Sequence, residues 1–182
     1  MADKTSFDLI VIGSGPGGYV AAIRAAQLGM DVACVETDEL GGVCLNIGCI
    51  PTKAMLSSAL LVNEMKEGEK HGITASELTF DLGPAQERSR GVAAQMAKGI
   101  GFLFKKNKVD HFDAHAKITK GAGSGGGGMC EVELYDCDVQ ETLTHAPTEV
   151  KGKTETLKAK NVLVATGSVA RDLPFARFDG DK

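Results

Sequence analysis

The chain has 182 residues, of which 43% are hydrophobic and 24% are charged. This length and composition indicate a globular protein of one domain, or slightly more, with a sizeable hydrophobic core. The formal net charge of −4 provides no basic excess of the kind that binding to a nucleic-acid backbone requires. Nucleic acid is therefore not an expected partner.

The N-terminus carries no recognisable targeting signal. Residues 1–6 are polar, and neither a basic segment with an apolar core nor an Arg-rich presequence is visible. No apolar stretch reaches the roughly 18 residues that a membrane-spanning helix needs. We therefore expect a cytoplasmic protein that does not contact a membrane.

The first forty residues have the pattern of a βαβ unit. The apolar run 7–12 ends at Gly13 and is typical of a buried parallel strand. Small and apolar residues over 15–28 predict a tightly packed helix that stops at Gly29, and 31–36 predicts a second buried strand. The whole unit takes about 30 residues, the usual size of a βαβ motif.

The remaining elements follow in chain order. We expect helices over 51–67 and 83–106, an extended segment over 109–118, a Gly-rich loop over 121–128, and strands over 129–135 and 161–166. In the second of these helices, Val92, Met96, Ile100 and Leu103 are spaced to share one face. The fold class is α/β: a Rossmann-like parallel sheet with helices on both faces plus a small antiparallel β-meander.

A dinucleotide fingerprint lies in the first turn. Gly13, Gly15 and Gly18 form G-x-G-x-x-G between a strand and a helix, and Glu36 follows 18 residues after Gly18. Gly13 permits the tight turn, Gly15 allows close approach of a pyrophosphate, and Gly18 allows helix and strand to pack closely. Glu36 can accept hydrogen bonds from the hydroxyls of an adenosine ribose. A glycine-rich turn of an unrelated α/β protein is the alternative, and the fingerprint serves FAD and NAD alike.

The cysteines point to redox chemistry or metal binding. The five cysteines lie at positions 34, 44, 49, 130 and 137, and Cys44 and Cys49 stand five residues apart at the opening of a helix. Thiolates near a helix N-terminus have a lowered pKa, which favours disulfide exchange. A zinc site would need about four ligands, and Cys130 and Cys137 are too far apart to form a second knuckle, so no metal is expected. Two ordinary buried cysteines are the other alternative.

The amino-acid sequence around this cysteine pair resembles that of a known family. Residues 41–53 read GGVCLNIGCIPTK, which resembles the redox signature shared by dihydrolipoamide dehydrogenase, glutathione reductase and mercuric reductase, and most resembles that of dihydrolipoamide dehydrogenase. Residues 164–168, VATGS, resemble the second FAD motif of the same family. The resemblance covers essentially the whole chain except the Gly-rich stretch, and it implies FAD as the cofactor.

The resemblance also implies roles for individual residues. Cys44 would attack the substrate disulfide, Cys49 would form the charge-transfer thiolate against the flavin, and Lys53 would lie near the flavin ring. Glu36 would bind the adenosine ribose, and 114–116 would contact the adenine, although this stretch reads AHA where the family has Gly-x-Gly. The residues expected at the cofactor are Gly13, Gly15, Pro16, Gly17, Gly18, Glu36, Gly41, Gly42, Val43, Cys44, Lys53, Ala114, His115, Ala116, Ala165, Thr166, Gly167 and Ser168.

The reaction implied by the resemblance is dithiol oxidation. A whole enzyme of this kind would be a homodimer that oxidises dihydrolipoamide, or the lipoyl domain of a 2-oxo acid dehydrogenase complex, and passes the electrons through the Cys44–Cys49 disulfide and FAD to NAD. A mercuric or glutathione-type reductase and a catalytically silent FAD-binding fragment are the alternatives.

The parts that such an enzyme also needs are not found in the sequence. After Gly18, G-x-G-x-x-G recurs only within the Gly-rich loop, at 121–126 and 123–128, and no His-Glu pair follows Ser168. We therefore expect residues 1–182 to be an FAD-binding domain without the NAD-binding, central and dimer-interface domains. On its own, the chain is expected to be inactive.

Overall fold

The structure is a computed structural model that describes residues 4–74, 76–123, 127–139, 147–168, 173 and 175. Its centre is a six-stranded sheet in the order β3-β2-β1-β6-β5-β4. The Gly-rich loop expected over 121–128 lies partly outside the described residues, at 124–126.

The parallel part of the sheet is built from the apolar runs of the sequence. It consists of β1 (Ser6–Ile12), β2 (Val32–Glu36), β3 (Asp110–Asp113) and the last part of β6 (Pro147–Val164). Ile10 and Val11 of β1 are fully buried, one on each face of the strand. Burial on both faces explains why the strand reads as a continuous apolar run rather than as an alternating one.

The antiparallel part forms the expected meander. It consists of β4 (His115–Lys120), β5 (Cys130–Val139) and β6, which pairs with β5 before it continues alongside β1. Val132, Leu134 and Leu157 of the meander pack on Ile10 and Val35 of the parallel strands. The Rossmann-like sheet and the meander confirm the predicted fold class. One detail differs: the face of the parallel sheet that carries Ile10 and Val35 is covered by the meander, where a layer of helices was expected.

The other face of the sheet is covered by helices. It packs against α1 (Pro16–Gln27) and the C-terminal half of α4 (Leu82–Asn107) through a second apolar cluster that includes Val11, Ala22 and Phe104. The expected stop of the first helix is confirmed, since α1 ends before Gly29, which has a left-handed φ of 89°.

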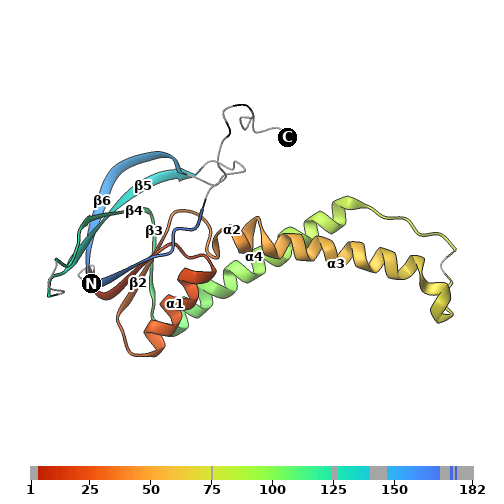
Figure 1. Ribbon diagram of the computed structural model, residues 1–182, viewed down its shortest axis with the longest axis horizontal. Helices are drawn as coiled ribbons and strands as arrows, with labels where there is room; N and C mark the ends of the chain where they lie inside the picture. Colours follow the sequence, from red (N-terminus) through yellow and green to blue (C-terminus); the bar gives the residue numbers. More distant parts are fainter. Residues whose placement is uncertain are drawn as a thin grey trace.

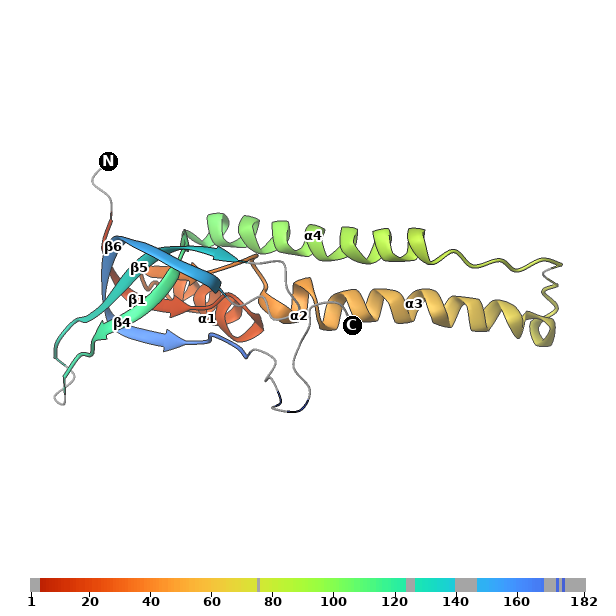
Figure 2. The same ribbon diagram turned by 90° about the horizontal axis from the view of Figure 1, so that it is seen from above.

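A long helical pair extends from the sheet. It begins with α2 (Gly42–Asn46) and α3 (Cys49–Lys66), continues through the short helix η1 (Gly68–His71), and returns along α4. Figures 1 and 2 show α3 and α4 side by side, projecting together away from the sheet. The distal part of α3 exposes apolar side chains. By length and composition alone, the stretch 42–66 could span a membrane, a test that core helices of soluble proteins also pass.

The buried face of α4 differs from the expected one. Met96 and Leu103 are exposed by 42% and 39%. The residues that α4 buries are mostly small: Ala85, Ser89, Ala93, Ala97, Ile100 and Phe104. Of the four residues expected to share one face, Ile100 is buried, Val92 is half-buried, and Met96 and Leu103 are exposed. Small residues face the neighbouring helices instead, since they allow close approach.

Two phenylalanines of α4 test this assignment of its faces. Phe104→Ala removes a ring that is 2% exposed and is expected to lower the free energy of unfolding by about 3–5 kcal/mol, because it leaves a cavity under α1. Phe102→Ala is the matched control, since its ring is 65% exposed, and should change stability by less than about 0.5 kcal/mol. Urea unfolding followed by circular dichroism measures both, and equal effects would contradict the assignment.

The turn between β1 and α1 depends on close backbone contact. Gly13 has a φ of 96°, in the left-handed region that favours glycine. A Cβ atom at Gly18 would overlap the carbonyl group of Gly13. At Gly17, by contrast, no atom lies within 4 Å of the place that a Cβ would take. The role predicted for Gly18 in close packing of helix and strand therefore agrees with the geometry.

Alanine substitutions at these neighbouring glycines should have opposite effects. Gly18→Ala forces the turn and the helix apart and is expected to destabilise the fold by about 1–3 kcal/mol. Gly17→Ala should be neutral or slightly stabilising, because alanine favours helix and meets open space. Thermal unfolding of the two variants measures the difference, and a Gly18→Ala protein as stable as Gly17→Ala would refute the packing role.

Candidate cofactor and disulfide site

The carboxyl ends of the parallel strands meet at one edge of the sheet. The amide of Gly13 donates to the carbonyl of Val35 at 2.8 Å, and the amide of Ala165 donates to that of Ile12 at 2.8 Å. A cavity of about 490 Å³ opens at this edge. Ligands of open α/β sheets bind at this position, outside the carboxyl ends of the strands.

One end of the cavity is formed by the N-terminus of α1. Gly15 is the N-cap, no side chain caps the helix, and its first turn contains no acidic residue. Gly13, Gly15 and Pro16 line the cavity there. Free backbone N–H groups and the helix dipole make such a terminus a favourable place for an anion, for example a pyrophosphate.

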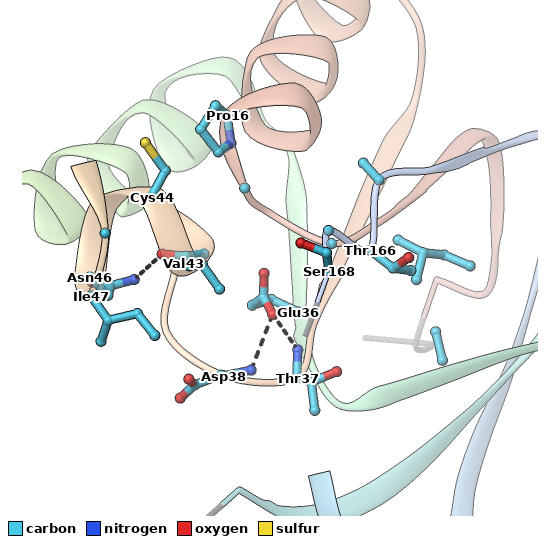
Figure 3. Close-up of a pocket in the computed structure, with 18 of the residues that line it drawn as sticks. Pro16, Glu36, Thr37, Asp38, Val43, Cys44, Asn46, Ile47, Thr166 and Ser168 are labelled. Carbon is cyan, nitrogen blue, oxygen red and sulfur yellow. Dashed lines mark hydrogen bonds between the residues drawn. The ribbon is translucent and has the colours of Figure 1, made fainter. Parts of the chain in front are cut away.

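The Glu36 carboxylate lies at the edge of the cavity and is held by four donors. Its Oε1 accepts from the amides of Thr37 and Asp38 at 2.8 and 3.2 Å, as the dashed lines of Figure 3 show. Its Oε2 accepts from the amide and the hydroxyl of Ser14 at 2.6 and 2.7 Å. The acid at the end of β2 is therefore held in a fixed orientation at the cavity wall.

The redox-active candidates are bonded to each other. Cys44 of α2 and Cys49, the first residue of α3, form a disulfide with their Cα atoms 4.7 Å apart. Both line the same cavity as Glu36. Cys49 opens an 18-residue helix, where the helix dipole stabilises negative charge on a sulfur released by reduction.

The segment that carries the cysteines is fixed by backbone contacts. The side-chain amide of Asn46 donates to the carbonyls of Leu40 and Gly42, both at 3.1 Å. Three consecutive residues of α4 donate to carbonyls around Cys49: Arg88 to Ala54 at 3.0 Å, Ser89 to Pro51 at 3.0 Å, and Arg90 to Asn46 at 3.4 Å. The helical pair therefore holds the disulfide in place.

Most of the residues expected at the cofactor do line the cavity. They are Gly13, Gly15, Pro16, Glu36, Gly42, Val43, Cys44, Cys49, His115, Ala116, Ala165, Thr166, Gly167 and Ser168. Figure 3 shows Val43 and Cys44 on the opposite side of Glu36 from Thr166 and Ser168. The lining residues that sequence reasoning missed are Ile12, Thr37, Asp38, Asn46, Ile47 and Gly48. Each of these residues is close in sequence to the dinucleotide fingerprint or to the cysteine pair, and this closeness could have predicted their place in the cavity wall.

Five expected residues do not line the cavity. Gly17 is exposed to solvent, and Gly18 and Gly41 are buried. Ala114 is 6% exposed, and its amide donates to the Glu36 carbonyl at 2.8 Å. Its backbone therefore holds the end of β2 and does not face the cavity. Lys53 is exposed on α3 beside Leu56 and Leu60, and its role near a flavin ring stays a prediction.

The other cysteines are separate from this site. Cys34 is fully buried in β2, and burial, with a smaller effect from the charge of Glu36, raises the pKa of its thiol to about 12. The Cys137 thiol lies 3.9 Å from the carbonyl of Thr37, and burial also raises its pKa. High thiol pKa values leave little thiolate at neutral pH, so neither residue is a ready nucleophile.

Comparisons with known proteins agree with this site. The profile of a family described as pyridine nucleotide-disulphide oxidoreductase matches residues 7–181. The chain is 44% identical over 180 residues to a dihydrolipoyl dehydrogenase of Zymomonas mobilis, covering 99% of this chain and 34% of that protein. It is also 44% identical over 176 residues to a dihydrolipoyl dehydrogenase of Rhizobium etli, covering 96% of this chain and 35% of that protein.

A solved structure has the same fold. The crystal structure of LpdA from Mycobacterium tuberculosis matches 95% of this chain and 34% of its own, with a TM-score of 0.76 and 24% sequence identity. The chain thus spans about a third of the length of the relatives it matches. With its dinucleotide turn and its cysteine pair at one cavity, the chain belongs to the pyridine nucleotide-disulphide oxidoreductase family.

Proposed function

We propose that this chain is the FAD-binding part of a dihydrolipoyl dehydrogenase. The single observation that carries the proposal is that the Cys44–Cys49 disulfide and the Glu36 carboxylate line one cavity. A dinucleotide anchored at Glu36 would then extend toward the cysteine pair. The names of the relatives, at 44% identity, support this particular enzyme among the flavin disulfide oxidoreductases.

The residues present fit FAD. Glu36 would hold the adenosine ribose, the N-terminus of α1 would hold the pyrophosphate, and 165–168 would lie along the cofactor at the end of β6. His115 and Ala116 would contact the adenine through their backbone groups. Because Gly13 and Gly15 carry no side chains, the pyrophosphate can approach the backbone closely at these two residues.

The cysteine pair would exchange electrons with a dithiol substrate. One thiolate of dihydrolipoamide attacks the Sγ of Cys44, and the Cys44–Cys49 bond breaks to leave the Cys49 thiolate. The second substrate thiol then attacks the mixed disulfide and releases lipoamide, so the protein pair gains two electrons and two protons. Bound FAD would accept these electrons and transfer them to NAD⁺.

Several further features belong to the proposal alone. The substrate would be dihydrolipoamide, either free or on the lipoyl domain of a 2-oxo acid dehydrogenase complex, and the whole enzyme would be a cytoplasmic homodimer with NAD as acceptor. The relatives' names support the choice of dihydrolipoamide as substrate. No contact with nucleic acid or membrane is part of the proposed function.

The visible spectrum tests the cofactor and the role of Cys49 together. After loading with FAD, the chain should be yellow, and anaerobic addition of a dithiol should produce a long-wavelength charge-transfer shoulder. Cys49→Ser should retain the yellow band and lose the shoulder, because it removes the sulfur next to the flavin. Cys137→Ser is the matched control and should keep both. A colourless protein after loading, or an undiminished shoulder in Cys49→Ser, would be incompatible with the proposal.

The isolated chain should not complete the reaction. Outside the Gly-rich loop 121–128, its 182 residues contain one G-x-G-x-x-G, and the proposed enzyme also needs a nicotinamide site and an acid–base group. We expect dihydrolipoamide-dependent reduction of NAD⁺ to stay at the buffer background, at least about 10³-fold below a full-length relative, since one general acid–base group alone contributes about 10²–10⁴-fold. The assay follows absorbance of NADH, and robust turnover would contradict this division of the site.

A further inference from the structure

Ser14 is fully buried, and its hydroxyl contacts a residue of the cavity wall, Glu36, and the segment that leads to the cysteines, at Gly41. It occupies the variable position between Gly13 and Gly15, with a relative exposure of 0%. Its hydroxyl donates to Oε2 of Glu36 at 2.7 Å and accepts from the amide of Gly41 at 3.2 Å. The glycine fingerprint gives this position no role, since any small residue fits there.

The hydroxyl of Ser14 binds the side of the Glu36 carboxylate that faces away from the cavity. Ser14 does not line the cavity, whereas Glu36 does, so the carboxylate lies between Ser14 and any ligand. Thr37 and Asp38 hold Oε1 only, and Ser14 supplies both donors to Oε2. Hydrogen bonds from a hydroxyl to a carboxylate are short and strong, so this contact fixes the plane of the carboxylate.

The same hydroxyl ties Glu36 to the segment that carries the cysteines. The amide of Gly41 is shared between the Ser14 hydroxyl and the Ser14 carbonyl, at 3.2 and 3.1 Å. Gly41 directly precedes α2, which carries Cys44. Three segments therefore meet at one buried hydroxyl: the glycine turn, the end of β2 and the approach to the disulfide.

We infer that Ser14 is a positioning residue that orients Glu36 for recognition of the adenosine ribose hydroxyls. The inference rests on the proposed function, because it takes the adenosine half of FAD as the ligand at Glu36. Ser14 would contact no part of the cofactor. Its effect would pass through the carboxylate, which accepts hydrogen bonds from the ribose only if its oxygens face the cavity.

The experiment compares two nucleotides that differ only in the ribose. ADP and 2′,3′-dideoxy-ADP are titrated calorimetrically into the full chain and into Ser14→Ala. The wild-type chain should prefer ADP. Ser14→Ala should bind ADP about tenfold more weakly, the loss typical of one hydrogen bond to a charged group, and should bind 2′,3′-dideoxy-ADP unchanged. A merely structural role would weaken binding of both nucleotides equally, and that result would overturn the inference.

Two further variants complete the test. In a Glu36→Gln background, Ser14→Ala should cause no additional loss of ADP affinity, because its effect passes through the carboxylate; an additive loss would overturn the inference. Ser58→Ala, a matched serine whose hydroxyl donates to the Ala54 carbonyl on α3, should bind both nucleotides as the wild type does. Ser14→Ala should fold, since the amide of Gly41 keeps the Ser14 carbonyl as its acceptor. If the Ser14→Ala protein does not fold, Ser14→Gly replaces it in the experiment, with the same expected result.

The outcomes separate the two proposals. If the wild-type chain binds FAD and prefers ADP but the preference survives in Ser14→Ala, the positioning role fails and the proposed function stands. If the wild-type chain binds neither FAD nor ADP, the proposed function fails, and the role of Ser14 fails with it.

Discussion

The carboxylate of Glu36 connects segments that are far apart in the sequence. It accepts two hydrogen bonds from Ser14 in the first turn and two from the amides that follow β2. These contacts fix the end of β2 against the start of α1, and they define the wall on which a dinucleotide would lie. Because a partly buried carboxylate needs hydrogen-bond donors, the turn and the strand end can adopt their positions only together.

The second constraint acts on the disulfide. Cys44 belongs to the short helix α2, and Cys49 is the first residue of the 18-residue helix α3. Their position comes from Asn46 on one side and from Arg88, Ser89 and Arg90 of α4 on the other. The long α3–α4 pair can thus be understood as a support that holds the redox group at the cavity. In the proposed function, this rigidity would keep the sulfur of Cys49 at the place where the flavin arrives.

The parts of the fold with local patterns could be predicted from the sequence. The apolar run of β1, the glycine turn and the helix stop at Gly29 follow from residues adjacent in the chain. The cysteine pair was visible because its two members are five residues apart. The buried face of α4 was not predictable in this way, because Ala93 and Ala97 are buried by close helix contact rather than by their own hydrophobicity.

The contacts that position the site were also invisible in the sequence. Asn46 and Ser89 donate to backbone carbonyls. Every residue has a backbone carbonyl, so the sequence does not indicate which one accepts the hydrogen bond. Ser14 occupies a variable position of the fingerprint, and its partner Glu36 lies 22 residues away. The place near the flavin that the motif implies for Lys53 stays a prediction, and its side chain is exposed on α3. Such relations depend on tertiary geometry and not on local spacing.

The most direct test of the account is a crystal structure of the chain soaked with FAD. We expect electron density for one FAD in the cavity, with the adenosine ribose hydroxyls on Glu36, the pyrophosphate at the N-terminus of α1 and the flavin ring against Cys49. FAD density elsewhere on the molecule, or with the flavin ring at Glu36 and the adenine at the cysteine pair, would contradict it.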